Sequence, residues 1–218
     1  MKSVEIKKYY NKRYSTNKIE RPQKFYKKLI SLIPQKKGRL LDVGCGTGML
    51  LYFGELSGIS SYGVDISEVA VNLARKRLGE KRAKIKVASA EKIPYKNNFF
   101  DYVFCIGTLE HFSDIRKGLK EISRVSNRKT RFYFLVPNSK FLLWMFTKEK
   151  GTEQPQEKIL SLEEWSDVFE KEGFEILDIK KDVGPLTNKL IKNTIFTIGI
   201  KILPVKLTYQ FLFTLKKK

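Results

Sequence analysis

Short apolar runs alternate with stretches of helical hydrophobic spacing along most of the chain. A short apolar or alternating run predicts a strand, whereas apolar residues three and four positions apart predict a helix that buries one face. The predicted strands cover residues 40–43, 61–65, 84–88, 99–107, 131–136, 174–179 and 207–215. Because helical segments separate most of these strands, we expect an α/β domain. Its sheet should be doubly wound, seven-stranded and mostly parallel, with helices on both faces.

Helix-start signals place the helices between these strands. The predicted helices lie within residues 19–33, 67–78, 113–125 and 161–173, and their start signals are Pro22, Ser67, Ser113 and the capping box Ser161–Glu164. Residues 138–160 follow no regular pattern. Residues 186–203 carry isoleucine and leucine on one helical face and lysine elsewhere. Such a segment suits an anionic membrane surface, and it equally suits packing against the domain or a second subunit.

Three glycines separate the first predicted strand from a helix in residues 39–50, which read RLLDVGCGTGML. Glycine at such a turn allows unusual backbone dihedral angles and the close approach of a ligand. The N-terminus of the following helix offers free N–H groups and a partial positive charge, which suit a nucleotide or a carboxylate. The spacing is G-x-G-x-G, and Met49 stands where a dinucleotide fingerprint requires its third glycine. The strand also ends with an acid, Asp42.

Residues 42–48, DVGCGTG, resemble the first motif of the class I S-adenosylmethionine-dependent methyltransferases. Residues 106–112 resemble the small-molecule branch of that family, type 11, which includes enzymes of ubiquinone and menaquinone biosynthesis. The resemblance implies a Rossmann-like methyltransferase fold, with S-adenosylmethionine as cofactor and S-adenosylhomocysteine as product. It also implies one methyltransferase domain over residues 1–218, made of an N-terminal helical cover (1–38), a cofactor-binding half (39–137) and a substrate-side half (138–218).

A second acid, Asp65, ends the second predicted strand. It lies about twenty residues beyond the glycines, where α/β nucleotide sites place a carboxylate that accepts both ribose hydroxyl groups. By resemblance to the family, Ile66 lies against the adenine, and the N–H of Ala90 and the carboxylate of Glu91 meet the adenine edge. The predicted cofactor-binding residues are Asp42, Gly44, Cys45, Gly46, Gly48, Asp65, Ile66, Ala90, Glu91, Ile106 and Gly107.

Methyl transfer from a sulfonium requires an in-line nucleophile in a site cleared of water, and a general base only when that nucleophile carries a tightly held proton. His111 is the one histidine of the chain and follows the fourth predicted strand. We expect it to act as a base or to orient the substrate, although a structural role fits the same position. No tetrapeptide like Asn-Pro-Pro-Tyr follows that strand, which argues against methylation of adenine in nucleic acid or of protein glutamine. The N-terminal aromatic residues either close over the site or dock their helix on the sheet.

Length and composition narrow the setting of this chemistry. A chain of 218 residues suits one α/β domain with a substantial core. No run of about 18 apolar residues predicts a transmembrane helix, and no N-terminal apolar run predicts a secretory signal. Cys45 and Cys105 are too few for a disulfide framework, so we expect the cytoplasm, with peripheral attachment to a membrane as an option. With one histidine and two thiols, no metal site is predicted.

The net charge of +20 is concentrated at both ends of the chain. Residues 1–38 contain 12 basic and 2 acidic residues, and residues 185–218 contain 7 basic residues and no acidic ones. Basic ends favour RNA, anionic lipid or a phosphorylated substrate, although a lysine-rich proteome produces the same pattern. We expect a methyltransferase acting on a small hydrophobic or anionic acceptor. An RNA methyltransferase and a non-catalytic cofactor-binding module remain alternatives, and the oligomeric state stays open.

Overall fold

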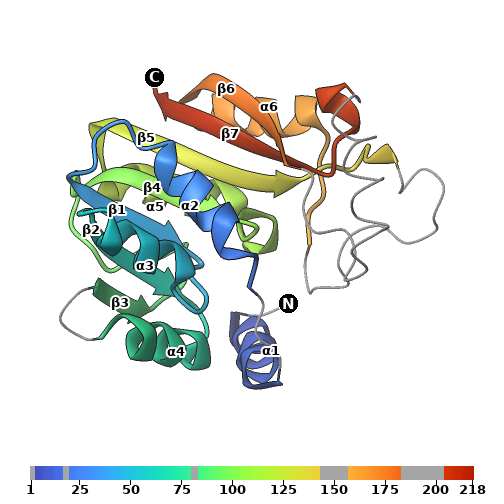
Figure 1. Cartoon of the computed structure of the whole chain (residues 1–218). Coiled ribbons are helices and arrows are strands. Elements are labelled where there is room, and N and C mark those ends of the chain that lie inside the picture. The colour runs from blue at the N-terminus through green and yellow to red at the C-terminus, as the bar shows by residue number, and fades with distance from the viewer. Residues whose placement is uncertain (1–2, 17–19, 80–82, 143–156, 183–203) are drawn as a thin grey trace.

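A seven-stranded sheet forms the centre of the computed structural model, which describes residues 3–16, 20–79, 83–142, 157–182 and 204–218. The strands are β1 Arg39–Val43, β2 Ser60–Asp65, β3 Ala83–Val87, β4 Phe100–Ile106, β5 Ser126–Pro137, β6 Phe174–Asp182 and β7 Gln210–Lys217. Their order in the sheet is β3-β2-β1-β4-β5-β7-β6. Strand β7 is antiparallel to both neighbours, whereas β1 to β5 pair in parallel. The predicted mostly parallel α/β sheet is confirmed (Figure 1).

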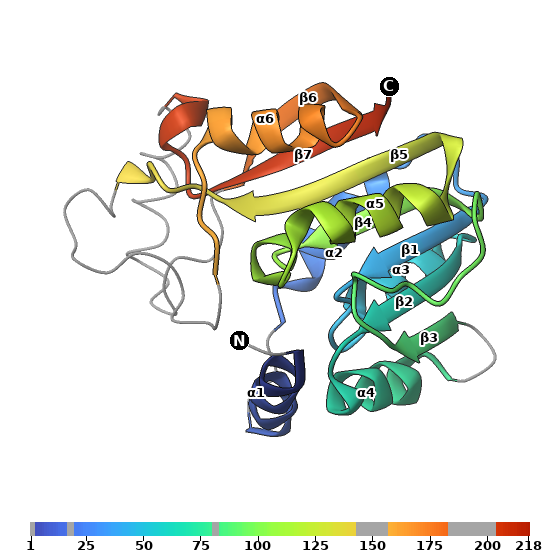
Figure 2. The ribbon, with the colours of Figure 1, turned by 180° about the vertical axis from the view of Figure 1, so that it is seen from behind.

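Helices cover both faces of this sheet. Those in the described ranges are α1 Ser3–Thr16, α2 Gln23–Ser31, α3 Met49–Leu56, α4 Glu68–Leu78, α5 Ile115–Val125 and α6 Leu162–Lys171, with 3₁₀ turns η1 Leu109–His111 and η3 Val205–Leu207. Helices α2 and α3 lie on one face, and α5 and α6 lie on the other, which Figure 2 shows from behind. Two hydrophobic cores result, one shared by the sheet with α2, α3 and α4, the other with α5 and α6.

Aromatic side chains fill the core under α6. Phe132 of β5 and Phe174 of β6 meet edge to face with ring centroids 5.0 Å apart, and Trp165 and Phe169 of α6 stack on each other. All four are fully buried. Trp165 also donates its Nε1–H to the carbonyl of Pro137 at 2.9 Å, so its one polar group is satisfied. Because large rings bury much apolar area and prefer these geometries, they hold α6 on the antiparallel end of the sheet.

Side-chain caps start the helices at or near the predicted residues. Ser67 caps α4, and Ser161 and Glu164 form both hydrogen bonds of the predicted capping box of α6. Helix α5 begins after Asp114, whose carboxylate accepts an N–H group of the first turn. The prediction that Ser113 caps this helix is therefore wrong by one residue. Aspartate and serine are about equally good N-caps, so the pair in sequence did not distinguish them.

Several elements differ from their predicted bounds. Strand β6 ends at Asp182 rather than at residue 179, and β7 spans Gln210–Lys217 rather than residues 207–215. Strand β5 begins at Ser126 rather than at residue 131, and its first residue pairs with Phe100 ahead of an irregularity in the register. Helix α1 is a separate element before the predicted N-terminal helix, which is α2. The predicted amphipathic segment, residues 186–203, lies outside the described residues. Among the described helices, none is long and apolar enough to cross a membrane.

Candidate functional site

A cavity of about 380 Å³ opens at the carboxyl ends of β1, β2 and β4. The strand order reverses between β1 and β4, and open α/β sheets bind their ligands at such a reversal. The volume lies within the range of about 300–1,000 Å³ that is usual for small-molecule sites. Of the predicted site residues, all but Gly48 line this cavity: Asp42, Gly44, Cys45, Gly46, Asp65, Ile66, Ala90, Glu91, Ile106, Gly107 and His111.

Backbone hydrogen bonds tie the glycine turn to the neighbouring strand. The N–H groups of Gly44 and Cys45 both donate to the carbonyl of Val64, at 2.8 and 3.0 Å. Gly46 donates its N–H to Oδ2 of Asp65 at 2.9 Å. The turn is thereby held against the carboxyl end of β2. The first-turn N–H groups of α3, which have no partner within the helix, begin directly behind it.

Two glycines of this turn are explained by packing. At Gly44, where φ is +76°, a Cβ atom would overlap the side chain of Thr108, which follows β4. At Gly48, where φ is +77°, a Cβ atom would lie 2.9 Å from Cβ of Ala74 in α4. Gly44 therefore lets the loop after β4 reach the turn. Gly48 lets α3 approach α4. This packing is enough to explain why glycine stands at this position, and no ligand is needed for the explanation.

Two buried carboxylates face the cavity from β1 and β2. Each oxygen of Asp65 accepts one backbone N–H, from Gly46 at 2.9 Å and from Ser67 at 2.8 Å. Burial raises the pKa of Asp65 to about 6, although these hydrogen bonds lower it. Burial, and then the charge of Asp65, raise the pKa of Asp42 to about 8. A positively charged ligand would favour the ionised form of both groups, so this end of the cavity suits a cation.

The segment after β3 lines the cavity beside Asp65. Ala88 donates its N–H to the carbonyl of Asp65 at 2.9 Å, which fixes where the segment leaves the sheet. Glu91 donates its N–H to the hydroxyl of Ser89 at 3.2 Å and accepts the N–H of Asp114 on Oε1 at 2.9 Å. One carboxylate oxygen of Glu91 therefore anchors the start of α5. This structural role was not predicted, and the predicted contact of Ala90 and Glu91 with adenine stays a prediction.

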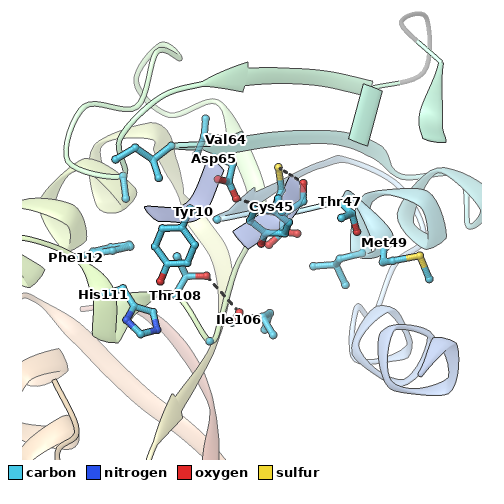
Figure 3. A pocket seen from close by; sticks show the side chains of 18 of the residues that line it. Tyr10, Cys45, Thr47, Met49, Val64, Asp65, Ile106, Thr108, His111 and Phe112 are labelled. Carbon is cyan, nitrogen blue, oxygen red and sulfur yellow. Dashed lines mark hydrogen bonds between the residues drawn. The ribbon is translucent and has the colours of Figure 1, made fainter. Parts of the chain in front are cut away.

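Helix α1 closes one side of the cavity with aromatic side chains. Tyr10 and Tyr14 line it one helical turn apart, and the hydroxyl of Tyr14 would lie 2.7 Å from a Cβ atom on Gly46. Burial is the main cause that raises the pKa of both tyrosines, so both stay neutral. Figure 3 shows the ring of Tyr10 over the cavity, between Asp65 and His111. From the sequence, these aromatic residues could either close over the site or dock their helix on the sheet. The i, i+4 spacing of the two tyrosines was the signal that places both rings on one face of the helix.

The linker between α1 and α2 is held to the glycine turn by a charged residue. Glu20 accepts hydrogen bonds from the hydroxyl of Thr47 and from the guanidinium of Arg77, each at 2.6 Å. On α1 itself, the hydroxyl of Ser67 donates to the side-chain oxygen of Asn11 at 2.7 Å. Glu20 and Thr47 both line the cavity and were not predicted from the sequence. No motif marks Glu20, because its partners lie 27 and 57 positions away.

The opposite end of the cavity is formed by the loop after β4 and by Tyr209, the residue before β7. His111 of η1 is 7% exposed and lies in edge-to-face contact with Tyr10, with ring centroids 6.1 Å apart. Arg21 and Tyr209 line the same end. Arg21 donates to Asp182 at 2.6 Å and also bonds Gln210, which links the N-terminal cover to the substrate-side strands. One cavity thus reaches from the glycine turn to His111.

A family model described as "Methyltransferase domain" matches residues 41–134, which include β1, the glycine turn, Asp65 and His111. Residues 41–134 thus match a methyltransferase domain, in agreement with the predicted class I S-adenosylmethionine-dependent type. "Uncharacterized methyltransferase YcgJ" of Bacillus subtilis is 28% identical over 152 residues, which are 66% of this chain and 59% of YcgJ. "Ubiquinone biosynthesis O-methyltransferase" of Aromatoleum aromaticum is 32% identical over 111 residues, which cover 50% of this chain and 47% of that enzyme. The chain thus spans 59% and 47% of the length of these two relatives.

A solved structure confirms the fold of this methyltransferase. A SAM-dependent methyltransferase from Aquifex aeolicus superimposes with a TM-score of 0.65 over 100% of both chains, at 18% identity. The match to a methyltransferase domain implies S-adenosylmethionine as the cofactor, and the cavity fits it. The two acids Asp42 and Asp65 suit the positive sulfonium and ammonium groups, which would favour the ionised form of both. Asp65 can still accept the ribose diol, since a carboxylate has about four lone-pair sites and the N–H groups of Gly46 and Ser67 occupy two of them.

Proposed function

We propose that this methyltransferase transfers the cofactor's methyl group to a small-molecule acceptor bound between His111, Tyr10 and Tyr209. The observation that carries this proposal is the continuity of one cavity from Asp65 to His111. A donor held at the glycine turn and an acceptor held at the η1 end would share a single enclosed space. Helix α1 covers that space, so the reacting atoms are shielded from bulk water.

The acceptor end of the cavity combines aromatic surface with a few polar groups. Tyr10, Phe112 and Tyr209 supply ring surface, and Arg21 and His111 supply donors or acceptors. Small-molecule sites usually have this composition, in which apolar walls bind and a few polar groups orient. A flat, hydrophobic acceptor with one hydroxyl, amine or acidic group fits these walls. This is the class of acceptor that the proposal names.

The proposed role of the chain's residues is mainly positional. When bound, the cofactor supplies an electrophilic methyl group that an acceptor attacks in line. Asp65, Asp42 and the glycine turn hold the donor end, and Tyr10 and His111 confine the acceptor opposite it. His111 can accept the proton of an acceptor hydroxyl or amine through an imidazole nitrogen, or orient that group by a hydrogen bond. The predicted binding residues and the single-domain division of residues 1–218 belong to this proposal.

The test supplies S-adenosylmethionine with a labelled methyl group to the purified enzyme together with a pool of small metabolites or, separately, total RNA. We expect label in the small-molecule pool and S-adenosylhomocysteine as product. His111→Gln should lower turnover by about 10²–10⁴-fold if His111 acts as a base, while the cofactor still binds with near wild-type affinity. Label found only in RNA, or cofactor binding with no transfer to any acceptor, would overturn the proposal.

A further inference from the structure

Two carboxylates and the one histidine of the chain meet beside the acceptor end of the cavity. Glu110 and His111 belong to η1, and Glu157 comes from the segment that precedes α6. One potential ligand atom from each residue lies within 4.8 Å of the other two. Oε1 of Glu110 is 3.9 Å from Nε2 of His111. The two η1 side chains are 3% and 7% exposed, so the cluster is largely withdrawn from solvent.

Backbone hydrogen bonds bring these distant positions together. Lys158 donates its N–H to the carbonyl of Glu110 at 2.9 Å, which sets Glu157 beside η1. Two residues further on, Leu160 forms an isolated bridge with Asn138, the residue that follows β5. Its carbonyl accepts the N–H of Ser139 at 3.0 Å. Glu157 is therefore held beside η1 by the backbone pairing of the residues that follow it.

One oxygen of the cluster lacks a partner within the described residues. Oε2 of Glu110 is fully buried and has no hydrogen bond there. A buried carboxylate oxygen without a hydrogen bond is costly, and such oxygens in proteins are normally hydrogen-bonded or bound to a metal ion. Arg21, the arginine that lines this end of the cavity, donates its guanidinium to Asp182 and Gln210. The buried oxygen therefore points to a ligand.

We propose that Glu110, His111 and Glu157 bind one divalent metal ion at the acceptor end of the cavity. One imidazole nitrogen and two carboxylates suit Mn²⁺, Zn²⁺ or Fe²⁺, which accept mixed nitrogen and oxygen ligands. Ligands about 2.1 Å from an ion in tetrahedral geometry are about 3.4 Å apart. The 3.9 Å between Glu110 and His111 needs only a small side-chain adjustment to reach that distance.

Three protein ligands leave coordination positions open, as in catalytic rather than structural metal sites. Because His111 lines the cavity, an open position would face the acceptor. An oxygen of the acceptor could then bind the ion and be oriented by it. This use of the site rests on the proposed function, whereas metal binding itself does not. The sequence predicted no metal because it offers no thiol and imidazole cluster, and the spacing of residues 110 and 157 matches no metal motif.

The test is titration of chelator-treated, full-length protein with Mn²⁺ and with Zn²⁺ by calorimetry, with the d–d absorption of bound Co²⁺ as a second readout. We expect one ion per chain and a Co²⁺ spectrum of mixed nitrogen and oxygen ligation. Loss of a residue that supports a metal ligand weakens metal binding by about 10–100-fold. Glu157→Gln and Glu110→Gln, which each remove a ligand, should weaken metal binding by more than that. Glu175→Gln is the matched control, because Glu175 of β6 pairs with Lys216 of β7 at 3.0 Å, and its loss should leave metal binding unchanged.

The outcomes separate this inference from the proposed function. No stoichiometric binding of any of the three ions, or equal binding by wild type and both cluster variants, overturns the metal site. The same samples are then titrated with S-adenosylmethionine and assayed for transfer of its labelled methyl group. These two measurements test the proposed function independently of the metal site. Metal binding that depends on Glu157, with no effect of the ion on methyl transfer, upholds the site and overturns its use on the acceptor.

Discussion

Asp65 offers the sharpest test of the cofactor site, because one carboxylate holds both the protein turn and the expected ribose. Its two oxygens accept N–H groups from Gly46 and Ser67 at 2.9 and 2.8 Å. In Asp65→Asn the volume hardly changes, but one oxygen becomes an NH₂ group. That group must then face a backbone N–H or turn towards the ribose hydroxyl groups as a donor. The substitution therefore disturbs recognition without opening a cavity.

The magnitude follows from the hydrogen bonds lost. A hydrogen bond to a charged group contributes about 1.5–3 kcal/mol, against about 1 kcal/mol for a neutral one. Replacing two charged contacts with the ribose by one neutral contact costs about 2–5 kcal/mol, which is a decrease in affinity of about 30- to 5,000-fold. Stability should change by only about 1 kcal/mol, because burial already raises the pKa of Asp65 to about 6 and the variant removes that buried charge.

The assay is calorimetric titration with S-adenosylmethionine, alongside urea unfolding of the same samples. Asp101→Asn is the matched control, since Asp101 accepts the N–H of Arg39 at 2.8 Å and the amide of Asn127 at 2.8 Å. Asp101 stands at the start of β4, the end of the sheet away from the cavity. We expect both variants to lose similar stability and only Asp65→Asn to lose affinity. Affinity within threefold of wild type in Asp65→Asn would refute the reasoning.

Three other predictions test the fold and the buried charges. Gly48→Ala should destabilise the protein by about 1–3 kcal/mol in urea unfolding, because φ is +77° and the new Cβ meets Ala74 at 2.9 Å. Ser161→Ala should lower the free energy of unfolding by about 1 kcal/mol through loss of the α6 cap, and Ser161→Asp should restore it. Without cofactor, the free energy of unfolding should fall as the pH rises from about 4 to about 8, because native Asp42, with pKa about 8, keeps a proton that the unfolded chain has released. Each such group contributes a slope of at most about 1.4 kcal/mol per pH unit, and Asp42→Asn should show a shallower dependence.

The central strands β1 and β4 were predictable because they are buried on both faces and are followed by glycine. Strands β2 and β3 lie within one residue of their predicted bounds. The first residues of β5 were missed because they are the polar run SNRKT, whose strand pairing depends on β4 and not on hydrophobic pattern. Helix α1 was missed for a similar reason. Ile6 is its one fully buried apolar residue among those described, so its hydrophobic stripe is weak.

The cofactor half of the site was predictable because its residues form local motifs at strand ends. The acceptor half was not, since it is assembled from residues far apart in sequence. Tyr10, Arg21 and Tyr209 reach the cavity from α1, from the linker after it and from the residue before β7. Glu157 reaches His111 only through the backbone pairing of Lys158 with Glu110. Such contacts depend on tertiary packing, and one sequence carries no local signal for them.

The loop at residues 107–111 connects these two halves. Thr108 packs into the space that Gly44 leaves open in the cofactor turn. His111 contacts Tyr10 of the helical cover, and the carbonyl of Glu110 holds the segment with Glu157. Any ligand that moves the glycine turn must therefore also move the residues that face the acceptor. For this reason we expect cofactor binding to order the acceptor end before an acceptor arrives, so that acceptor affinity should be higher with S-adenosylhomocysteine bound than without it.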